Sequence, residues 1–201
     1  GFYATWEHGR FEEHEYFNLV STMKLDEVRP FGRTCDEVEA ALKDSVRMHL
    51  RSDVELGVQL SGGVDSSLVT ALASMESGRK FHSFSISFGE PAFDESEYQK
   101  RVSERYHTEH HDYPLGEKDF TELIEKTLWH YEHPLNDPNT VATHFLTRRA
   151  KQYITVMLTG EGADESFLGY ARFNKISIDV LRRRNWLYKH PEIRKKLYHL
   201  W

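Results

Sequence analysis

The sequence predicts an α/β fold in which a mainly parallel sheet is flanked by helices. Four short, apolar, β-prone runs are spaced along the chain, and a helical pattern of apolar residues separates each run from the next. Strands that alternate with helices form parallel sheets, because each helix returns the chain to the same edge. Glycine-rich breaks follow the first and the last run directly, which is typical of ligand-binding loops in such folds.

The predicted elements follow one another with short connections. Strands are expected at residues 54–60, 81–88, 108–115 and 153–159, and helices at 34–50, between Gly63 and Gly78, at 94–106, 120–131 and 140–152, and again after Gly162. Ser, Thr and Asp favour helix starts, and an acid three residues later completes a capping box. We therefore expect Thr34 with Glu37, and Asp94 with Glu97, to begin two of these helices.

Composition excludes several classes of protein. The 201 residues suit one domain, and the hydrophobic fraction of 39% supports a folded core. The net charge of -6 disfavours nucleic acid and anionic membranes as partners, so the basic run at 182–196 is expected to be a solvated helix face. The single cysteine excludes an internal disulfide, and no apolar run approaches the roughly 20 residues of a membrane span. We expect a cytoplasmic protein without nucleic-acid or membrane partners.

The first chemical motif, LSGGVDSS at residues 60–67, lies between a predicted strand and a predicted helix. Gly62 and Gly63 allow the backbone to approach a phosphate closely, and the free N–H groups at a helix start favour an anion. Ser61 and Ser66 add hydroxyl groups, and Asp65 offers a hard oxygen for Mg²⁺. The stretch is not a Walker A loop, because no lysine follows the second glycine.

The second motif, LTGEGADESFLGY at residues 158–170, follows another predicted strand, so its acids are expected at the same edge of the sheet. Glu161, Asp164 and Glu165 are crowded together near one helix start. Like charges at this spacing repel one another unless a cation or the helix start compensates them. The two motifs together therefore indicate a site for a nucleotide with a metal ion.

Both motifs resemble those of one family. SGGVDS is similar to the pyrophosphate-binding loop of the ATP pyrophosphatase superfamily, and TGEGADE with the following GY is similar to the second signature of asparagine synthetases. The stretches FHSFSISF and FDESEY resemble that family's second strand and next helix. The resemblance covers roughly residues 29–173 and implies an adenine nucleotide alpha hydrolase-like fold that uses ATP and Mg²⁺.

The resemblance implies a role for each motif residue. The pyrophosphate of ATP would be held by Ser61, Gly62, Gly63, Asp65 and Ser66, and adenosine by backbone groups of Leu60, Ile86 and Gly160. Asp65 and Asp164 would bind Mg²⁺, and Glu161 would be the acid–base residue that helps ammonia lose a proton. A small carboxylic acid, with aspartate as the first candidate, would attack the α-phosphorus and release pyrophosphate. Ammonia would then convert the acyl-adenylate into an amide.

The resemblance also implies further parts. Residues 1–28 resemble the connector that leaves an N-terminal glutaminase domain, which would be a domain or subunit of the full protein; within them, residues 12–19 fit a short strand or a connector. Residues 29–201 would be the synthetase domain, truncated at its C-terminus. The family places a catalytic lysine there, which we cannot match to Lys175, Lys189, Lys195 or Lys196. A homodimer is left open.

Alternatives to this function stay open. The chain fits other adenylating enzymes of the superfamily, such as those that form β-lactams, NAD or GMP, or that thiolate tRNA, although thiolation usually needs more cysteines. It also fits a nucleotide-binding domain without activity of its own. Asp137, Asn139 and Thr140 lie in a predicted loop and could line the binding site of the acceptor acid, forming one wall of it. A metal site at His107, His110 and His111 is disfavoured, because neighbouring strand residues point to opposite faces.

Overall fold

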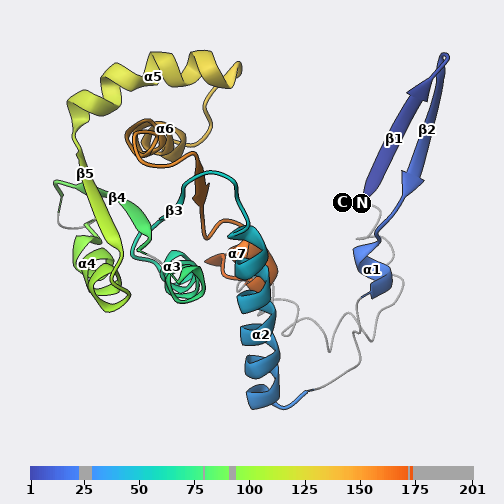
Figure 1. Ribbon diagram of the computed structural model, residues 1–201. Coiled ribbons are helices and arrows are strands. Elements are labelled where there is room, and N and C mark those ends of the chain that lie inside the picture. Colours follow the sequence, from blue (N-terminus) through green and yellow to red (C-terminus); the bar gives the residue numbers. More distant parts are fainter. Residues whose placement is uncertain (23–28, 79, 91–93, 172, 174–201) are drawn as a thin grey trace, which may run out of the picture. The chain divides into compact units, whose positions relative to one another are not determined.

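A computed structural model describes residues 1–22, 29–78, 80–90, 94–171 and 173. The chain forms two compact units, Gly1–Leu42 and a second that begins at Lys43. The second unit contains a parallel four-stranded sheet with the strand order β5-β4-β3-β6 (Figure 1). The predicted fold class, a parallel sheet flanked by helices, is therefore confirmed. Each described helix is too short or too polar to cross a membrane.

The order of the strands positions the two motifs side by side. The strands are β3 (Leu56–Gln59), β4 (His82–Phe88), β5 (Glu109–Leu115) and β6 (Val156–Leu158). β3 pairs in parallel with β4 on one side and with β6 on the other, and Val58 is in register with Leu158. The chain moves outward from β3 in two directions, which makes the β3–β6 boundary a switch point where ligands bind in open α/β sheets.

Helices cover both faces of this sheet. Figure 1 shows α3 (Val64–Ser77) and α4 (Ser96–Arg105) along one face, and α5 (Glu117–Tyr131) and α6 (Asn139–Ala150) along the other. The short α7 (Ala163–Phe167) follows β6. α3 ends where Gly78 adopts a left-handed conformation with φ 63°, as predicted from the glycine.

One part of the core lies between the sheet and α6, and buried residues of α3 pack on the other face. Phe84 of β4 packs with Leu146, Ala150 and Ile154, all buried. A second cluster joins α5 and α6 to the end of β5 through Leu115, Leu123, Val141 and Phe145. The apolar positions of α6 recur at helical spacing, so one stripe of the helix is buried against the strands. This packing fixes the sheet whose edge carries both motifs.

The first unit begins with a hairpin that the sequence analysis predicted only in part. β1 (Phe2–Glu7) pairs antiparallel with β2 (Arg10–Glu15), whereas a strand or connector was expected at residues 12–19. His8 and Gly9 join the strands with positive φ angles of 50° and 79°. Two-residue hairpin turns of type I′ need positive φ at both positions, and the glycine at the second was the available signal. α1 (Leu19–Thr22) follows.

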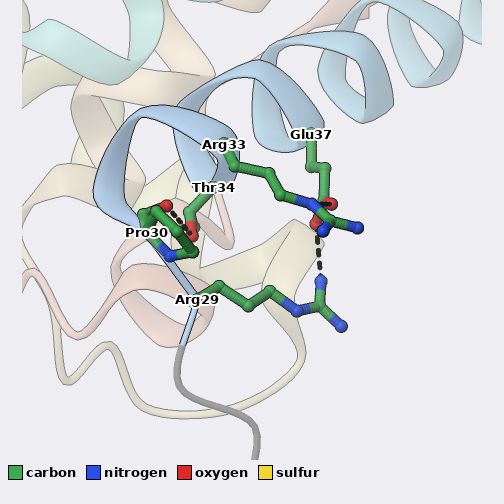
Figure 2. A network of polar contacts seen from close by, with 5 residues as sticks. All are labelled: Arg29, Pro30, Arg33, Thr34 and Glu37. Carbon is green, nitrogen blue, oxygen red and sulfur yellow. Dashed lines mark hydrogen bonds and ion pairs between the residues drawn. The ribbon is translucent and has the colours of Figure 1, made fainter.

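The predicted capping box at Thr34 is wrong, because α2 (Phe31–His49) begins three residues before it. Thr34 lies inside the first turn and its hydroxyl donates to the Pro30 carbonyl oxygen at 3.2 Å. Figure 2 shows Arg29 and Arg33 both reaching Glu37. The hydrogen bond from Arg33, with that from Arg29, holds the pKa of Glu37 below its usual value. Glu37 therefore joins the entering chain to the helix instead of capping it.

Two other helix starts differ from prediction. α4 begins at Ser96, and Asp94 accepts hydrogen bonds from its N–H and hydroxyl, while Glu97 pairs with Arg101 instead of completing a box. α5 begins at Glu117, three residues before the predicted start, because Asp119 accepts from the Gly116 N–H at 3.3 Å. The predicted tail helix at 182–196 lies outside the described residues.

Candidate functional site

The loop after β3 is held in shape by its own serines. Ser61 Oγ lies 2.8 Å from Ser66 Oγ, and the Ser61 N–H donates to Ser66 Oγ at 3.1 Å. Ser66 Oγ donates in turn to the Gly63 carbonyl oxygen at 3.2 Å, and the Gly63 N–H donates to Ser61 Oγ at 3.3 Å. Ser66 is buried, whereas Asp65 is exposed in the first turn of α3. These hydrogen bonds hold the loop in one conformation without a bound ligand, and Asp65 is on its solvent-exposed side.

Gly62 is required by both its conformation and its surroundings. Its φ is +97°, and a Cβ built on it would lie 3.0 Å from Glu95 Cβ and 3.1 Å from the Glu95 carbonyl oxygen. Most side chains are strained at positive φ. The loop thus packs closely on the segment that precedes α4, a contact that the sequence analysis did not predict.

The loop after β6 rests directly on the first loop. A Cβ on Gly160 would lie 2.9 Å from the Ser66 nitrogen and 3.1 Å from the Asp65 carbonyl carbon. The parallel register of Val58 with Leu158 explains this approach, since it brings the ends of β3 and β6 level. Gly162 then turns the chain into α7 with φ +90°. The two motifs, about 100 residues apart in the sequence, form one continuous surface.

One small cavity is shared by both loops. Its volume is about 170 Å³, and its lining includes Asp65, Ser66, Gly160, Glu161, Asp164 and Glu165. Four carboxylates around so small a space repel one another, and a divalent cation would relieve that repulsion. Carboxylate oxygens are the ligands that Mg²⁺ prefers in proteins. The donors present therefore fit a magnesium ion, with Asp65 contributed by the start of α3 and Asp164 by the start of α7.

A second cavity of about 260 Å³ continues from the first along the end of β4. Leu60, Ser61, Ile86, Gln99 and Glu161 are among its lining residues. The Leu60 N–H donates to the Phe84 carbonyl oxygen at 2.8 Å, and the Leu60 carbonyl oxygen accepts from Ser85 Oγ. That carbonyl keeps a second lone pair for a ligand. The predicted adenosine-binding residues Leu60 and Ile86 thus lie together in a partly apolar hollow.

A third and larger cavity, about 760 Å³, lies on the α5–α6 side. It is lined by the predicted acceptor-wall residues Asp137, Asn139 and Thr140 and also by Thr127, His130, His144, Glu161 and Asp164. His144 Nδ1 lies 2.8 Å from Thr127 Oγ1, and burial, with the nearby His130, lowers the pKa of His144. Glu161 lines all three cavities, as Gln59 does, so both residues lie where the cavities adjoin.

Three residues of this site were not predicted. Gln99 is buried and its Nε2 donates to the carbonyl oxygens of Ser61 and Ile86, each at 3.1 Å, which joins the first loop to β4. Tyr170 donates its hydroxyl to Glu165 at 2.7 Å. A Cβ on Gly169 would fall 2.0 Å from Asp164 Oδ1, so the glycine leaves room for that carboxylate. The Gly-Tyr pair stood in the motif, but only the structure shows its contacts.

A family model described as asparagine synthase matches residues 37–199. The chain belongs to the asparagine synthase family. Asparagine synthetase [glutamine-hydrolyzing] 1 of Bacillus subtilis is 37% identical over 138 residues, 67% of this chain and 21% of the relative. Asparagine synthetase B [glutamine-hydrolyzing] of Escherichia coli is 32% identical over 158 residues, 70% of this chain and 28% of the relative.

These relatives are much longer than the present chain. A protein from Methanocaldococcus jannaschii, 39% identical over 150 residues, is covered over only 29% of its length. Among solved structures, NMN synthetase from Francisella tularensis has a TM-score of 0.49 at 17% identity, with 67% of this chain and 58% of that chain covered. The residues that the family model matches include both loops described above, and the chain spans about a quarter of the length of these relatives.

Proposed function

We propose that this chain is an ATP-dependent amide-forming domain, which adenylates a carboxylic acid and transfers the acyl group to ammonia. Aspartate is the acid we propose, with asparagine, AMP and pyrophosphate as products. Family membership supports a ligase of the asparagine synthetase type. The observation that carries the proposal is the contact of Gly160 with Asp65 and Ser66, which joins the two motifs into one site.

The proposed roles follow from where the side chains lie. The N–H groups at the start of α3 and the loop of Ser61, Gly62, Gly63, Asp65 and Ser66 would hold the pyrophosphate, because a helix N-terminus stabilises an anion. Leu60 and Ile86 would hold adenosine through backbone groups at the 260 Å³ cavity, together with Gly160, which lines the adjoining 170 Å³ cavity. Asp65 and Asp164 would hold Mg²⁺, which when bound neutralises charge on the departing pyrophosphate.

Glu161 is the proposed acid–base residue. It borders the cavity of the nucleotide loops and the larger cavity with Asp137, Asn139 and Thr140, where we place the acceptor acid. A carboxylate at this junction can take a proton from ammonia as the nitrogen attacks the acyl carbon. General acid–base catalysis of this kind contributes about 10²- to 10⁴-fold.

Ammonia is proposed to come from a glutaminase domain or subunit. The Bacillus subtilis and Escherichia coli relatives carry glutamine-hydrolyzing in their names, and the chain covers 21% and 28% of them. We propose that residues 1–28 are the connector from such a domain and that residues 29–201 are the synthetase part. A cytoplasmic location accords with this assignment.

Exchange of labelled pyrophosphate into ATP tests the proposal. We expect magnesium-dependent exchange that requires aspartate, whereas glutamate and other acids give little. Glu161→Gln should retain ATP binding and slow amide formation from aspartate and ammonia by about 10²- to 10⁴-fold. Glu125→Gln, an exposed position on α5, is the matched control.

Two results would contradict the proposal. Exchange that requires an acid other than aspartate would indicate another adenylating enzyme of the superfamily. Magnesium-dependent ATP binding without exchange for any acid would indicate a nucleotide-binding domain.

A further inference from the structure

Three potential metal ligands converge at the opposite edge of the sheet from the nucleotide loops. His82 is the first residue of β4, and Glu109 and His111 are the first and third residues of β5. His82 is in register with Glu109, and Phe84 with His111. Residues two apart on a strand share a face, so all three side chains lie on the same side of the sheet. Their nearest ligand atoms all lie within 4.8 Å of one another.

The spacing of the two imidazoles suits a shared metal ion. His82 Nδ1 lies 3.1 Å from His111 Nε2. Two nitrogens bound to tetrahedral Zn²⁺ at about 2.0–2.1 Å are about 3.3 Å apart. Small side-chain rotations would therefore place both nitrogens at bonding distance from one ion, and the adjacent carboxylate of Glu109 can supply a third ligand.

The surroundings hold the rings in place. His111 stacks on Phe84 with the ring centroids 5.0 Å apart and an interplanar angle of 13°, and the Tyr153 ring contacts both, at 4.2 Å from His111 and 6.0 Å from Phe84. All three side chains are partly buried, and the neutral form of an imidazole is the form that binds metals. Fixed, half-buried imidazoles lose little freedom when a metal binds.

One charged group competes for the same carboxylate. Lys80 Nζ lies 3.1 Å from Glu109 Oε2, and this ion pair lowers the pKa of Glu109. The Lys80 side chain is 68% exposed, so it can leave for solvent at little cost when a cation of higher charge arrives. The other charged neighbours of His111 are His82 and Glu109 themselves.

We propose that His82, Glu109 and His111 form a zinc-binding site at the amino edge of the sheet. Two imidazoles and one carboxylate favour Zn²⁺ over Mg²⁺ or Ca²⁺, which prefer oxygen ligands throughout. Three protein ligands leave a fourth position for water. The ion would join β4 to β5 at the amino ends of the strands. His82 is in register with Gly57, so the loop that starts at Ser61 begins four strand residues, or about 13 Å, further along the sheet. Its role is to stabilise the fold, and it takes no part in adenylation.

The sequence analysis disfavoured a metal site formed by His107, His110 and His111, and the structure explains why this trio cannot form one. His110 does point to the other face, where its Nδ1 lies 2.9 Å from Ser83 Oγ. His107 occupies the turn before β5 with φ +54°. Only His111 of that trio joins the site. Its partners are Glu109, two residues earlier on β5, and His82 on β4, and the sequence alone does not reveal the pairing with β4.

Calorimetric titration of the full chain with ZnCl₂, in excess Mg²⁺ to occupy oxygen-only sites, tests the proposal. We expect one zinc per chain and a rise in thermal midpoint. Glu109→Gln and His82→Gln should each weaken zinc binding by at least about tenfold, since even indirect partners of a metal cost about 10- to 100-fold. His49→Gln, at an exposed histidine on α2, is the control for loss of one imidazole.

Lys80→Met gives the sharpest comparison because it should tighten zinc binding by removing the competing ammonium. A simple network of hydrogen bonds and an ion pair predicts no such gain. Substitution with Co²⁺ should give the intense visible bands of a tetrahedral site in the wild type and lose them in Glu109→Gln. The proposal is overturned if zinc binding is absent, or if Glu109→Gln, His82→Gln and Lys80→Met all bind zinc as His49→Gln does.

Discussion

The two edges of the sheet offer different ligands because different parts of the chain supply them. At the carboxyl edge, the groups come from loops beyond the strands: serine hydroxyls, glycine backbone and the carboxylates of Asp65 and Asp164. At the amino edge, His82, Glu109 and His111 belong to the strands themselves. Loops allow the close backbone approach that a phosphate needs, whereas a rigid strand pair fixes the spacing of two imidazoles. The same sheet thus presents an oxygen-rich site at one end and a nitrogen-rich site at the other.

The largest expected effect concerns the contact between the two loops. Gly160→Ala places a Cβ 2.9 Å from the Ser66 nitrogen, so the loops must separate. We expect the affinity for MgATP to fall by about tenfold or more, because displacements near 1 Å at a site are costly. Gly32→Ala adds the same methyl group where nothing lies within 4 Å and is the control. Equal MgATP affinities of the two variants in calorimetry would contradict the importance of this contact. Zinc binding should be unchanged in both variants, because the zinc site lies at the other end of the strands.

A smaller effect is expected at Gln99, whose side chain joins the loop after β3 to the end of β4. Gln99→Met keeps a similar volume but leaves the carbonyl oxygens of Ser61 and Ile86 without their donor. We expect the free energy of unfolding to fall by about 0.5–1.5 kcal/mol in urea titrations, the net worth of a typical hydrogen bond. The loss is small because the variant also removes Gln99 Oε1, a buried acceptor without a partner among the described residues. Gln99 is 2% exposed, and Gln152→Met at an exposed position is the matched control. Equal stabilities in the two variants would show that the bridge contributes nothing.

The smallest effect concerns pH and acts mainly at the amino edge. Burial lowers the pKa values of His110, His111 and His144, so the unfolded chain binds their protons first as the pH falls. The free energy of unfolding should therefore decrease below the unfolded histidine pKa of about 6.5 and continue to fall towards the folded values. His110→Gln should reduce this slope, with His49→Gln as control. An unchanged slope in urea titrations between about pH 7.5 and 5.5 would contradict the assignment.

The sequence predicted the sheet because its strands are apolar runs with clear breaks. Val58 and Leu60 are fully buried, and Gly78 ends α3 as expected. Helix starts were less predictable, since Asp119 supports the start of α5 from inside its first turn and Thr34 bonds backward to Pro30. The first residue of a helix depends on which local hydrogen bond forms, and the same pattern of residue types is compatible with several such hydrogen bonds.

The candidate site was predictable only where its residues are adjacent in the sequence. Both loops could be recognised as motifs, but Gln99 could not. It lies in a helix with no motif around it, and its role depends on hydrogen bonds to the carbonyl oxygens of Ser61 and Ile86, which are distant in the sequence. The zinc site was missed for the same reason. Its ligands are 27 and 29 residues apart, as His82 to Glu109 and His82 to His111, and only strand register brings them together.

A double-mutant cycle with Asp65→Asn and Asp164→Asn tests the central claim most directly, namely that the two loops hold one metal–nucleotide complex. MgATP affinity is measured by calorimetry for the wild type, both single variants and the double variant. Two ligands of the same ion should show coupling, so the double variant should lose much less than the sum of the two single losses. Strictly additive losses would mean that the two carboxylates act independently and would contradict a shared magnesium site.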